Sequence, residues 1–249
     1  MKRIFDIMAS LSGLLLTAPI LLVFMLLVWL QDRHSPFYIA PRIARHGRSF
    51  QMIKLRSMVI HADKSGVDST SADDRRITTI GRLIRRYKLD ELTQLINVFT
   101  GDMSLVGPRP QVARDVALYT ETEKQLLTAK PGITDFASIV FSDEGDILAG
   151  RADPDLTYNQ LIRPGKSRLG LFYIHNRSLL VDIQIILFTI LAIISRPHAL
   201  RAVAGLLHRL DAPAELIALS LRTEPLTPAP PPGADAIVTT RTHKEEGQI

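Results

Sequence analysis

Residues 7–30 read IMASLSGLLLTAPILLVFMLLVWL and contain no charged side chain. As an α-helix, these 24 residues would extend ~36 Å, which exceeds the ~30 Å hydrocarbon core of a bilayer. The length of the run and the lack of a small-residue cleavage pattern disfavour a cleaved signal peptide. The run therefore predicts a membrane segment over residues 1–32, and it decides the fold class before any other part of the chain is considered.

The flanks of this run, and a proline inside it, bear on its topology. Basic residues precede it at Lys2 and Arg3, and a stronger basic group follows from Arg33 to Arg48. Because Lys and Arg favour the cytoplasmic side, both flanks prefer the same face. Pro19 removes the helical hydrogen bond to the carbonyl of Leu15 and favours a kink. Two topologies fit about equally: a re-entrant hairpin of two helical halves broken at Pro19, and a spanning helix with a proline kink.

Residues 88–110, KLDELTQLINVFTGDMSLVGPRP, carry the strongest chemical signal. Asp90 and Glu91 fall between two stripes of apolar residues spaced three and four apart, which predicts that they begin a helix. Unpaired backbone N–H groups and the macrodipole stabilise a carboxylate there. An ionised Asp90 could act as a nucleophile or a metal ligand. Acidic residues also serve commonly as simple first-turn stabilisers, so the neighbouring residues have to decide between these roles.

Cations are predicted close to this acidic pair. Prolines on both sides fix the backbone of Arg109. A planar guanidinium held in this way suits two phosphate oxygens better than a mobile lysine would. Residues 50–58 (FQMIKLRSM) predict a short strand, and its period-two alternation places Lys54 and Arg56 on one face. Held cations beside two carboxylates indicate phosphate chemistry.

Basic residues are concentrated in one part of the chain. Residues 33–88 contain thirteen Lys and Arg against four Asp and Glu, whereas the remainder is net acidic. Such a block attracts nucleotide phosphates, anionic lipid head groups or nucleic acid. Aromatic residues do not alternate with these cations as stacking platforms would. We therefore expect no nucleic-acid partner, and the preceding apolar run favours a membrane.

The order of short motifs along the chain resembles that of the bacterial sugar transferases, the monotopic phosphoglycosyl transferases of cell-surface glycan assembly. The resemblance covers roughly residues 1–196. Any one motif alone is weak, whereas so many in the same order argue against a chance match. The matching motifs are KRIFD (2–6), KLRSM (54–58), LDEL (89–92) with Gln94 and Asn97, GDMS (101–104), VGPRP (106–110) and KPGIT (130–134).

This resemblance implies a two-step transfer of a sugar phosphate onto a lipid. Asp90 would attack the sugar-side phosphorus of a nucleoside diphosphate sugar, with uridine favoured, and polyprenyl (undecaprenyl) phosphate would then accept the sugar phosphate. The resemblance also implies Mg²⁺ held by Glu91, and phosphate binding by Lys54, Arg85 and Arg109. Two adjacent carboxylates repel each other unless a cation compensates, which gives a physical reason to expect Mg²⁺.

The implied fold is mixed α/β and predominantly helical. A membrane-embedded N-terminal helix would hold a small catalytic domain, with short strands and interfacial helices, on the cytoplasmic face of the bacterial inner membrane. We expect the membrane segment over 1–32, the catalytic domain over 33–196, a helical extension over 197–224 and a disordered tail over 225–249. The tail is rich in proline and has little apolar surface to bury.

Two further segments carry expectations. Residues 179–195 are apolar but interrupted by Asp182, so we expect a helix packed on the domain or lying at the interface, not a span. Residues 134–163 carry six acidic residues, for which a solvated loop is favoured over a role in sugar or metal binding. The absence of cysteine excludes disulfides and thiol catalysis.

Two other functions remain open. A membrane-bound nucleotide-sugar pyrophosphatase would use the same carboxylates and cations but transfer the phosphate to water. A non-catalytic basic scaffold would leave the paired acids and the held arginine unexplained. Neither the sugar nor the oligomeric state follows from the sequence.

Overall fold

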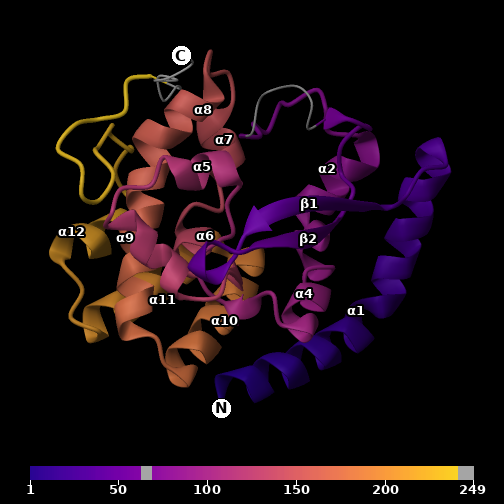
Figure 1. The fold of residues 1–249 in the computed structure, drawn as a ribbon, viewed down its shortest axis with the longest axis horizontal. Coiled ribbons are helices and arrows are strands. Elements are labelled where there is room, and N and C mark those ends of the chain that lie inside the picture. The colour runs from indigo at the N-terminus through magenta and orange to yellow at the C-terminus, as the bar shows by residue number, and fades with distance from the viewer. Residues whose placement is uncertain (63–68, 241–249) are drawn as a thin grey trace, which may run out of the picture.

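The periodic apolar stretches of the sequence form helices in the computed structural model, which describes residues 1–62 and 69–240 (Figure 1). Within those residues the chain is mostly helical with short strands, which confirms a mixed α/β, predominantly helical fold. In chain order the elements are α1 (Lys2–Asp32), β1 (Phe37–Ile43), η1 (Arg45–Gly47), β2 (Ser49–Leu55), α2 (Thr79–Arg86), α3 (Leu89–Leu92), α4 (Leu95–Thr100), β3 (Ser104–Val106), α5 (Ala113–Ala117), η3 (Glu123–Thr128), β4 (Gly132–Thr134), α6 (Phe136–Val140), α7 (Glu144–Leu148), α8 (Pro154–Thr157), η4 (Tyr158–Ile162), α9 (Arg163–Asn176), α10 (Leu179–Ile194), α11 (Arg196–Arg209) and α12 (Ala214–Leu221).

The strands make two small sheets. β1 and β2 form an antiparallel hairpin in which Phe37 pairs with Leu55 and Ile43 pairs with Ser49. β3 and β4 form a short parallel pair. The strand predicted over 50–58 therefore forms, but it ends at Leu55. The free edge of β2 lies against α3 and α4, and this contact positions the acidic pair.

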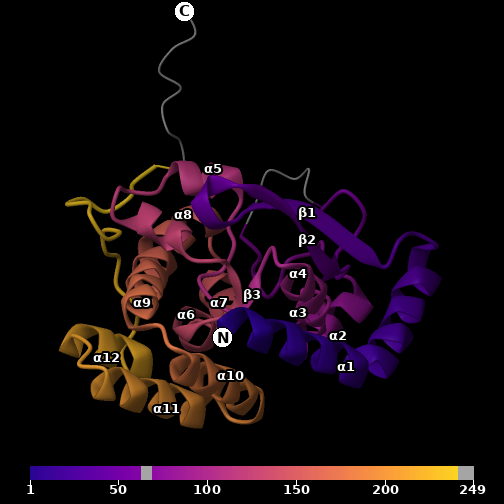
Figure 2. The same cartoon turned by 60° about the horizontal axis from the view of Figure 1, so that its bottom comes forward.

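The apolar run forms one helix, α1, which is the only described helix long and apolar enough to cross a membrane. Pro19 lies inside it, and the helix remains continuous through this residue. Figures 1 and 2 both show α1 changing direction about halfway along its length. Thr17 donates a hydrogen bond to the carbonyl of Gly13, 2.7 Å away. The hairpin alternative predicted two separate helical halves, whereas the structure has one bent, continuous helix. A single proline removes only one backbone hydrogen bond of the helix, which is not enough to divide it.

Both ends of α1 are attached to the same globular domain. At the N-terminal end, Lys2 forms an ion pair with Asp182, and Arg3 donates to two carbonyls of α4 at 2.5 and 2.7 Å. At the C-terminal end, Asp32 accepts two hydrogen bonds from Arg56, at 2.5 and 2.7 Å. The middle of the helix is largely exposed. The helix therefore lies along the domain as a strap fixed at its two ends.

The main hydrophobic core lies between α6, α9, α10, α11 and α12, with Phe136, Leu169 and Leu207 fully buried. A second, smaller cluster joins the C-terminal half of α1 to β2, α2 and α3 through Val28 and Ile84. This second cluster matters for function because it fixes the start of α3 beside β2.

The predicted helix over 179–195 forms as α10 and packs on the domain through Val181 and Ile185. Its opposite face leaves apolar side chains exposed at helical spacing, namely Leu180, Ile183, Leu187, Ile190 and Ile194. Figure 2 shows α10 and α11 on the same side of the molecule as the N-terminal half of α1.

Two predictions about the C-terminal part of the chain are corrected. The acidic segment 134–163 is not a solvated loop, because its carboxylates cap α6 and α8 or pair with cations such as Lys166 and Arg196. Residues 225–240 were expected to be disordered, but they lie against the domain: Ala229 donates to the carbonyl of Gln160, and Thr120 donates to the carbonyl of Pro232. The fixed backbone of Pro232 offers its carbonyl to Thr120 at little entropic cost. The remainder of that predicted tail, 241–249, falls outside the described residues.

Candidate active site

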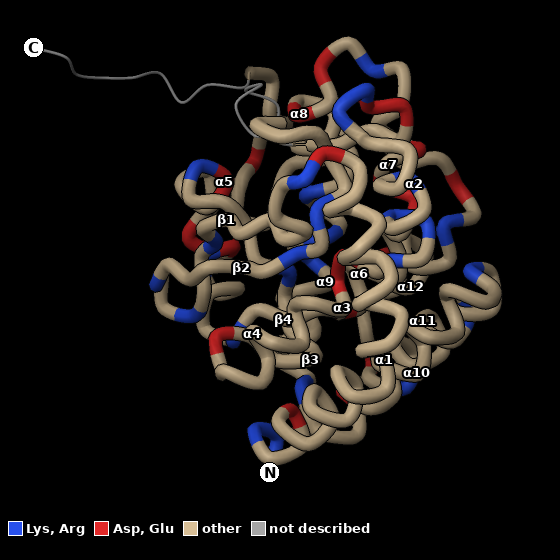
Figure 3. The backbone as a smooth tube through the Cα atoms, turned by 90° about the vertical axis from the view of Figure 1, so that its right-hand side faces the viewer, with Lys and Arg blue, Asp and Glu red and all other residues tan. Residues whose placement is uncertain are grey.

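The acidic pair occupies the first turn of a helix, as the sequence predicted. Lys88 adopts a left-handed backbone with φ 56°, which separates α2 from α3. Asp90 and Glu91 follow immediately in α3. Figure 3 shows acidic positions close to basic ones in the region of β2 and α3. The break at Lys88 therefore places Asp90 beside β2, the strand that carries Lys54.

Asp90 faces the end of β2. Its Oδ2 lies 3.5 Å from the Nζ of Lys54, which is a loose ion pair. The hydroxyl of Thr93 donates to the carbonyls of both Asp90 and Ile53, each at 3.1 Å, so the first turn of α3 is tied to the strand. The Asp90 carboxylate is held in place but not saturated with protein donors, which is what a nucleophile requires.

Glu91 is paired with the arginine between the prolines. The guanidinium of Arg109 lies 2.9 Å from Oε1 of Glu91. Burial pushes the pKa of Glu91 upward, but the charges of Arg109, Lys54 and Lys88 outweigh burial and lower this pKa to about 2. The carboxylate of Glu91 in turn raises the pKa of Arg109. Both side chains are therefore charged at any physiological pH.

The loop that carries Arg109 is fixed by a close crossing of two backbones. Gly107 donates to the carbonyl of Thr134, and Gly132 donates to the carbonyl of Pro108, each at 3.0 Å. A Cβ atom added at Gly132 would lie 2.1 Å from the backbone nitrogen of Gly107. The glycines of the VGPRP and KPGIT motifs thus face each other, and only residues without side chains permit this approach.

Arg85 approaches the same carboxylates from α2. Its Nε donates to the hydroxyl of Ser57 at 3.0 Å, and burial lowers its pKa while the negative charges of Asp90 and Asp74 oppose that effect. α2 can lie close to the residues after β2 because Gly81 has no side chain. A Cβ atom there would sit 1.8 Å from the carbonyl oxygen of Ser57.

Arg56 does not join this cluster, contrary to the alternation of the predicted strand. Its guanidinium instead binds Asp32 at the end of α1, and its Nε donates to the carbonyl of Ser35 at 2.8 Å. The physical reason is that β2 ends at Leu55, so the period-two rule no longer governs the next residue. Among the predicted cations, the structure gathers Lys54, Arg85 and Arg109 around the acidic pair.

The acidic pair can be tested as a holder of Mg²⁺. Within the described residues no three His, Cys, Asp or Glu side chains gather to hold a metal. Mg²⁺ is commonly bound by one or two carboxylates, with substrate phosphates and water completing an octahedron. Glu91, next to Asp90 and paired with Arg109, offers a carboxylate of this kind. The residues therefore fit a metal ion that arrives with a phosphate substrate.

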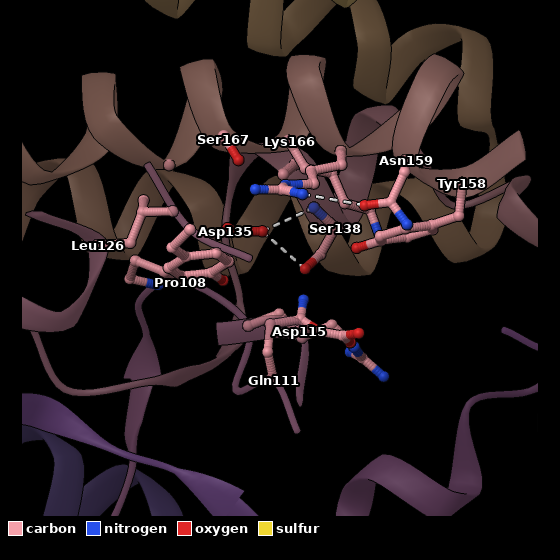
Figure 4. Close-up of a pocket in the computed structure, with 15 residues that line it drawn as sticks. Pro108, Gln111, Asp115, Leu126, Asp135, Ser138, Tyr158, Asn159, Lys166 and Ser167 are labelled. Atoms are coloured by element: carbon pink, nitrogen blue, oxygen red, sulfur yellow. Dashed lines mark hydrogen bonds between the residues drawn. The ribbon is translucent and has the colours of Figure 1, made fainter. Parts of the chain in front are cut away.

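Sequence reasoning missed a group of polar residues beyond Arg109. A cleft opens there, and Figure 4 shows Asp135 and Ser138 within it, with Tyr158 and Asn159 beside them. These residues come from segments that are distant in sequence, so no local motif joins them. The only signal was the cluster of acidic residues over 134–163, which we had interpreted as a solvated loop.

A long apolar helix attached to a domain with paired carboxylates and three cations is consistent with a membrane-associated enzyme that handles phosphate. Comparison with known proteins gives the family. The bacterial sugar transferase family model matches residues 1–196, and the chain belongs to this family. The resemblance found in the sequence is thereby confirmed, as is the prediction that the chain is a transferase.

Several curated relatives cover most of the matched region. The chain is 35% identical over 190 residues to the uncharacterized sugar transferase EpsL of Bacillus subtilis, covering 76% of this chain and 85% of that protein. It is 33% identical over 207 residues to the exopolysaccharide production protein ExoY of Rhizobium meliloti, covering 77% and 84%. It is 39% identical over 198 residues to the undecaprenyl-phosphate glucose phosphotransferase of Komagataeibacter xylinus, covering 76% of this chain and 35% of that longer protein.

Proposed function

We propose that this chain transfers a sugar 1-phosphate from a nucleoside diphosphate sugar, most naturally a uridine one, to undecaprenyl phosphate, and so begins the assembly of an exopolysaccharide or another surface glycan. The observation that carries this proposal is the placement of Asp90 and Glu91 beside Lys54, Arg85 and Arg109, on a domain strapped by a long apolar helix. The names of the relatives support the lipid acceptor.

The chemistry would proceed through Asp90. Its carboxylate oxygen attacks the sugar-side phosphorus, the bond from that phosphorus to the bridging oxygen breaks, and nucleoside monophosphate leaves with the electron pair. The sugar phosphate remains on Asp90 as an acyl phosphate. An oxygen of undecaprenyl phosphate then attacks the same phosphorus, which restores the carboxylate and forms undecaprenyl diphosphate sugar. Nucleophilic catalysis of this kind divides one difficult displacement into two easier ones.

The surrounding cations would hold the diphosphate and compensate its charge. Arg109 offers a planar donor set for two phosphate oxygens, held by its fixed loop. Lys54 already faces Asp90 and would lie next to the attacked phosphate. Glu91, together with phosphate oxygens, would hold Mg²⁺, which when bound neutralises charge that develops on the leaving group.

The topology that we favour is re-entrant, with the catalytic domain on the cytoplasmic face of the inner membrane. α1 bonds the domain through Lys2 at one end and Asp32 at the other. A straight span would place these ends on opposite sides of the bilayer, where one domain cannot reach both. The exposed apolar face of α10 would then rest at the lipid interface.

The test is a nucleotide-sugar panel with the protein in nanodiscs, together with Mg²⁺ and undecaprenyl phosphate. Nucleoside monophosphate and lipid-linked sugar are measured together for the wild type and Asp90→Asn. We expect one sugar to give both products, and Asp90→Asn to give neither. Monophosphate and free sugar phosphate without glycolipid would instead indicate a pyrophosphatase, and full activity of Asp90→Asn would refute the assignment of the nucleophile.

A further inference from the structure

A cleft opens beyond Arg109, lined by polar side chains from α6, η4 and α9. Its enclosed space is about 50 Å³, so a bound group would lie partly in its open mouth. Arg109 belongs both to this cleft and to the pair with Glu91. A ligand whose phosphates lie between Asp90 and Arg109 would therefore have its next chemical group at the mouth of the cleft.

The wall of the cleft presents a buried carboxylate. Asp135 is only 3% exposed, and its Oδ1 accepts bonds from the backbone and the hydroxyl of Ser138 at 2.6 and 2.7 Å. In the part of the chain that the structure describes, its other oxygen, Oδ2, accepts no hydrogen bond. A buried carboxylate with an unused oxygen has free capacity to accept a hydrogen bond from a ligand.

An unusual turn forms another wall. Residues Tyr158–Ile162 form a π-helical turn at the start of α9, and such turns are rare and frequent at functional sites. This turn places Tyr158 and Asn159 along the cleft, and Figure 4 shows both near Asp135 and Ser138. The tail holds the turn in place, because Ala229 bonds the carbonyl of Gln160 and the Gln160 amide bonds the carbonyl of Val238.

The chemistry of this lining identifies the class of ligand. The unused oxygen of Asp135 and the hydroxyl oxygen of Ser138 can accept hydrogen bonds from a ring that bears several hydroxyls. Asn159 is already bonded to Asp155 and Arg163, so these two oxygens are the principal acceptors for a ligand. Two cations of the lining are already paired, Arg163 with Glu123 and Lys166 with Glu144, so a second phosphate would gain little there. A lipid chain would leave the polar groups without partners. The lining therefore suits neither of the other two parts of the reaction.

We propose that this cleft binds a hydroxyl-bearing ring of the nucleotide sugar, with Asp135 and Ser138 as its principal hydrogen-bonding partners. This proposal rests on the proposed function, which supplies the diphosphate beside Arg109. The transferred sugar and the ribose of the nucleoside share the recognised chemistry, and the experiment separates them.

The experiment measures dissociation constants by calorimetry in the Asp90→Asn protein, where no turnover occurs. The probes are the UDP-sugar that gives product in the panel above, UDP and UMP. The variants are Asp135→Asn, which keeps a helix-capping side chain, and Ser138→Ala. Asp153→Asn is the matched control, because it makes the same change at the cap of α8 outside the cleft lining.

We expect Asp135→Asn to weaken binding of the UDP-sugar about tenfold, since a hydrogen bond to a charged group is lost. A loss for the UDP-sugar alone places the transferred sugar in the cleft, and an equal loss for UDP and UMP places the ribose there. Unchanged affinities for all three probes in both variants would overturn the proposal. Failure of the proposed function is a separate result, because it appears as absence of glycolipid from the wild-type protein.

Discussion

Arg56 makes two hydrogen bonds to Asp32, at 2.5 and 2.7 Å, and so ties the end of the apolar helix to the turn after β2. Neither residue touches the acidic pair. The KLRSM motif therefore has two functions: Lys54 faces the candidate nucleophile, while Arg56, two residues later, anchors the membrane helix.

Replacement of Arg56 should damage the anchor and not the binding of nucleotide. We expect Arg56→Ala to destabilise the protein by about 1–3 kcal/mol, because a charge-assisted pair is lost. Thermal unfolding in detergent measures this change, and calorimetry with UDP should give an unchanged dissociation constant. Lys54→Ala is the matched comparison and should show the reverse pattern. An equal loss of UDP affinity in both variants would place Arg56 in the site after all.

The two ends of α1 should be accessible from the same side of the membrane. The chain has no cysteine, so Ile4→Cys and His34→Cys each introduce a unique thiol at an exposed position. A membrane-impermeant maleimide added to spheroplasts should label neither variant, and the same reagent added to inverted vesicles should label both. Labelling of one variant in spheroplasts and the other in inverted vesicles would mean that α1 spans the bilayer.

The ion pair of Glu91 with Arg109 should stabilise the fold in a pH-dependent way. The pKa of Glu91 falls from an ordinary value of 4.5 to about 2 in the folded protein. Its stabilisation is therefore complete above pH 4.5 and is lost as the pH falls toward 2. We expect Glu91→Gln to lower the unfolding temperature at pH 7 and to match the wild type near pH 2. The control Glu121→Gln, at a carboxylate that is 89% exposed, should change little at either pH.

Removal of the tail, residues 223–249, should weaken binding of the nucleotide sugar, although its described part, residues 223–240, does not line the cleft. A chain that ends at Arg222 lacks Ala229 and Val238, and so loses their hydrogen bonds with Gln160, which hold the π-helical turn. We expect its KM for the UDP-sugar to rise several-fold while kcat changes less. A chain that ends at Thr240 keeps these bonds and serves as the control. Equal KM values for the two truncated chains would show that the turn holds its shape unaided.

Substitution at the backbone crossing should be severe. A side chain at Gly132 would meet the backbone of Gly107 at 2.1 Å, and backbone atoms cannot move aside cheaply. We expect Gly132→Ala to displace the loop of Arg109 and to remove most transferase activity. Gly205→Ala, in α11, is a useful comparison, since its Cβ would meet nothing within 4 Å and its backbone is helical. Near-normal activity of Gly132→Ala would show that this crossing is not needed.

The parts of the site that sequence could predict are those encoded by neighbouring residues. The change of apolar period near Lys88 predicted the helix start at Asp90, and the prolines around Arg109 predicted a held cation. Arg56 was placed on the face of Lys54, but it turns to Asp32, and no local signal marks the end of β2 at Leu55. The alternation rule was extended one residue too far.

The cleft could not be predicted for a different reason. Its walls come from residues between Pro108 and Gly170, and only the packing of α6, α9 and the tail brings them together. The tail itself was misjudged because it is rich in proline and has few large apolar residues. Its binding to the domain depends on backbone carbonyls, such as that of Pro232, which composition does not reveal.

Asn97 also covers the free edge of the β1–β2 hairpin. Its amide donates to the carbonyl of Gln51 and accepts from the N–H of Ile53, at 2.7 and 2.9 Å, while Thr93 occupies the carbonyl of Ile53. The side chains of Thr93 and Asn97 thus satisfy the backbone groups of β2 to which a third strand would otherwise bond. An open sheet edge is a template for pairing with other chains. The hairpin is therefore closed at this edge to pairing with a strand of another chain.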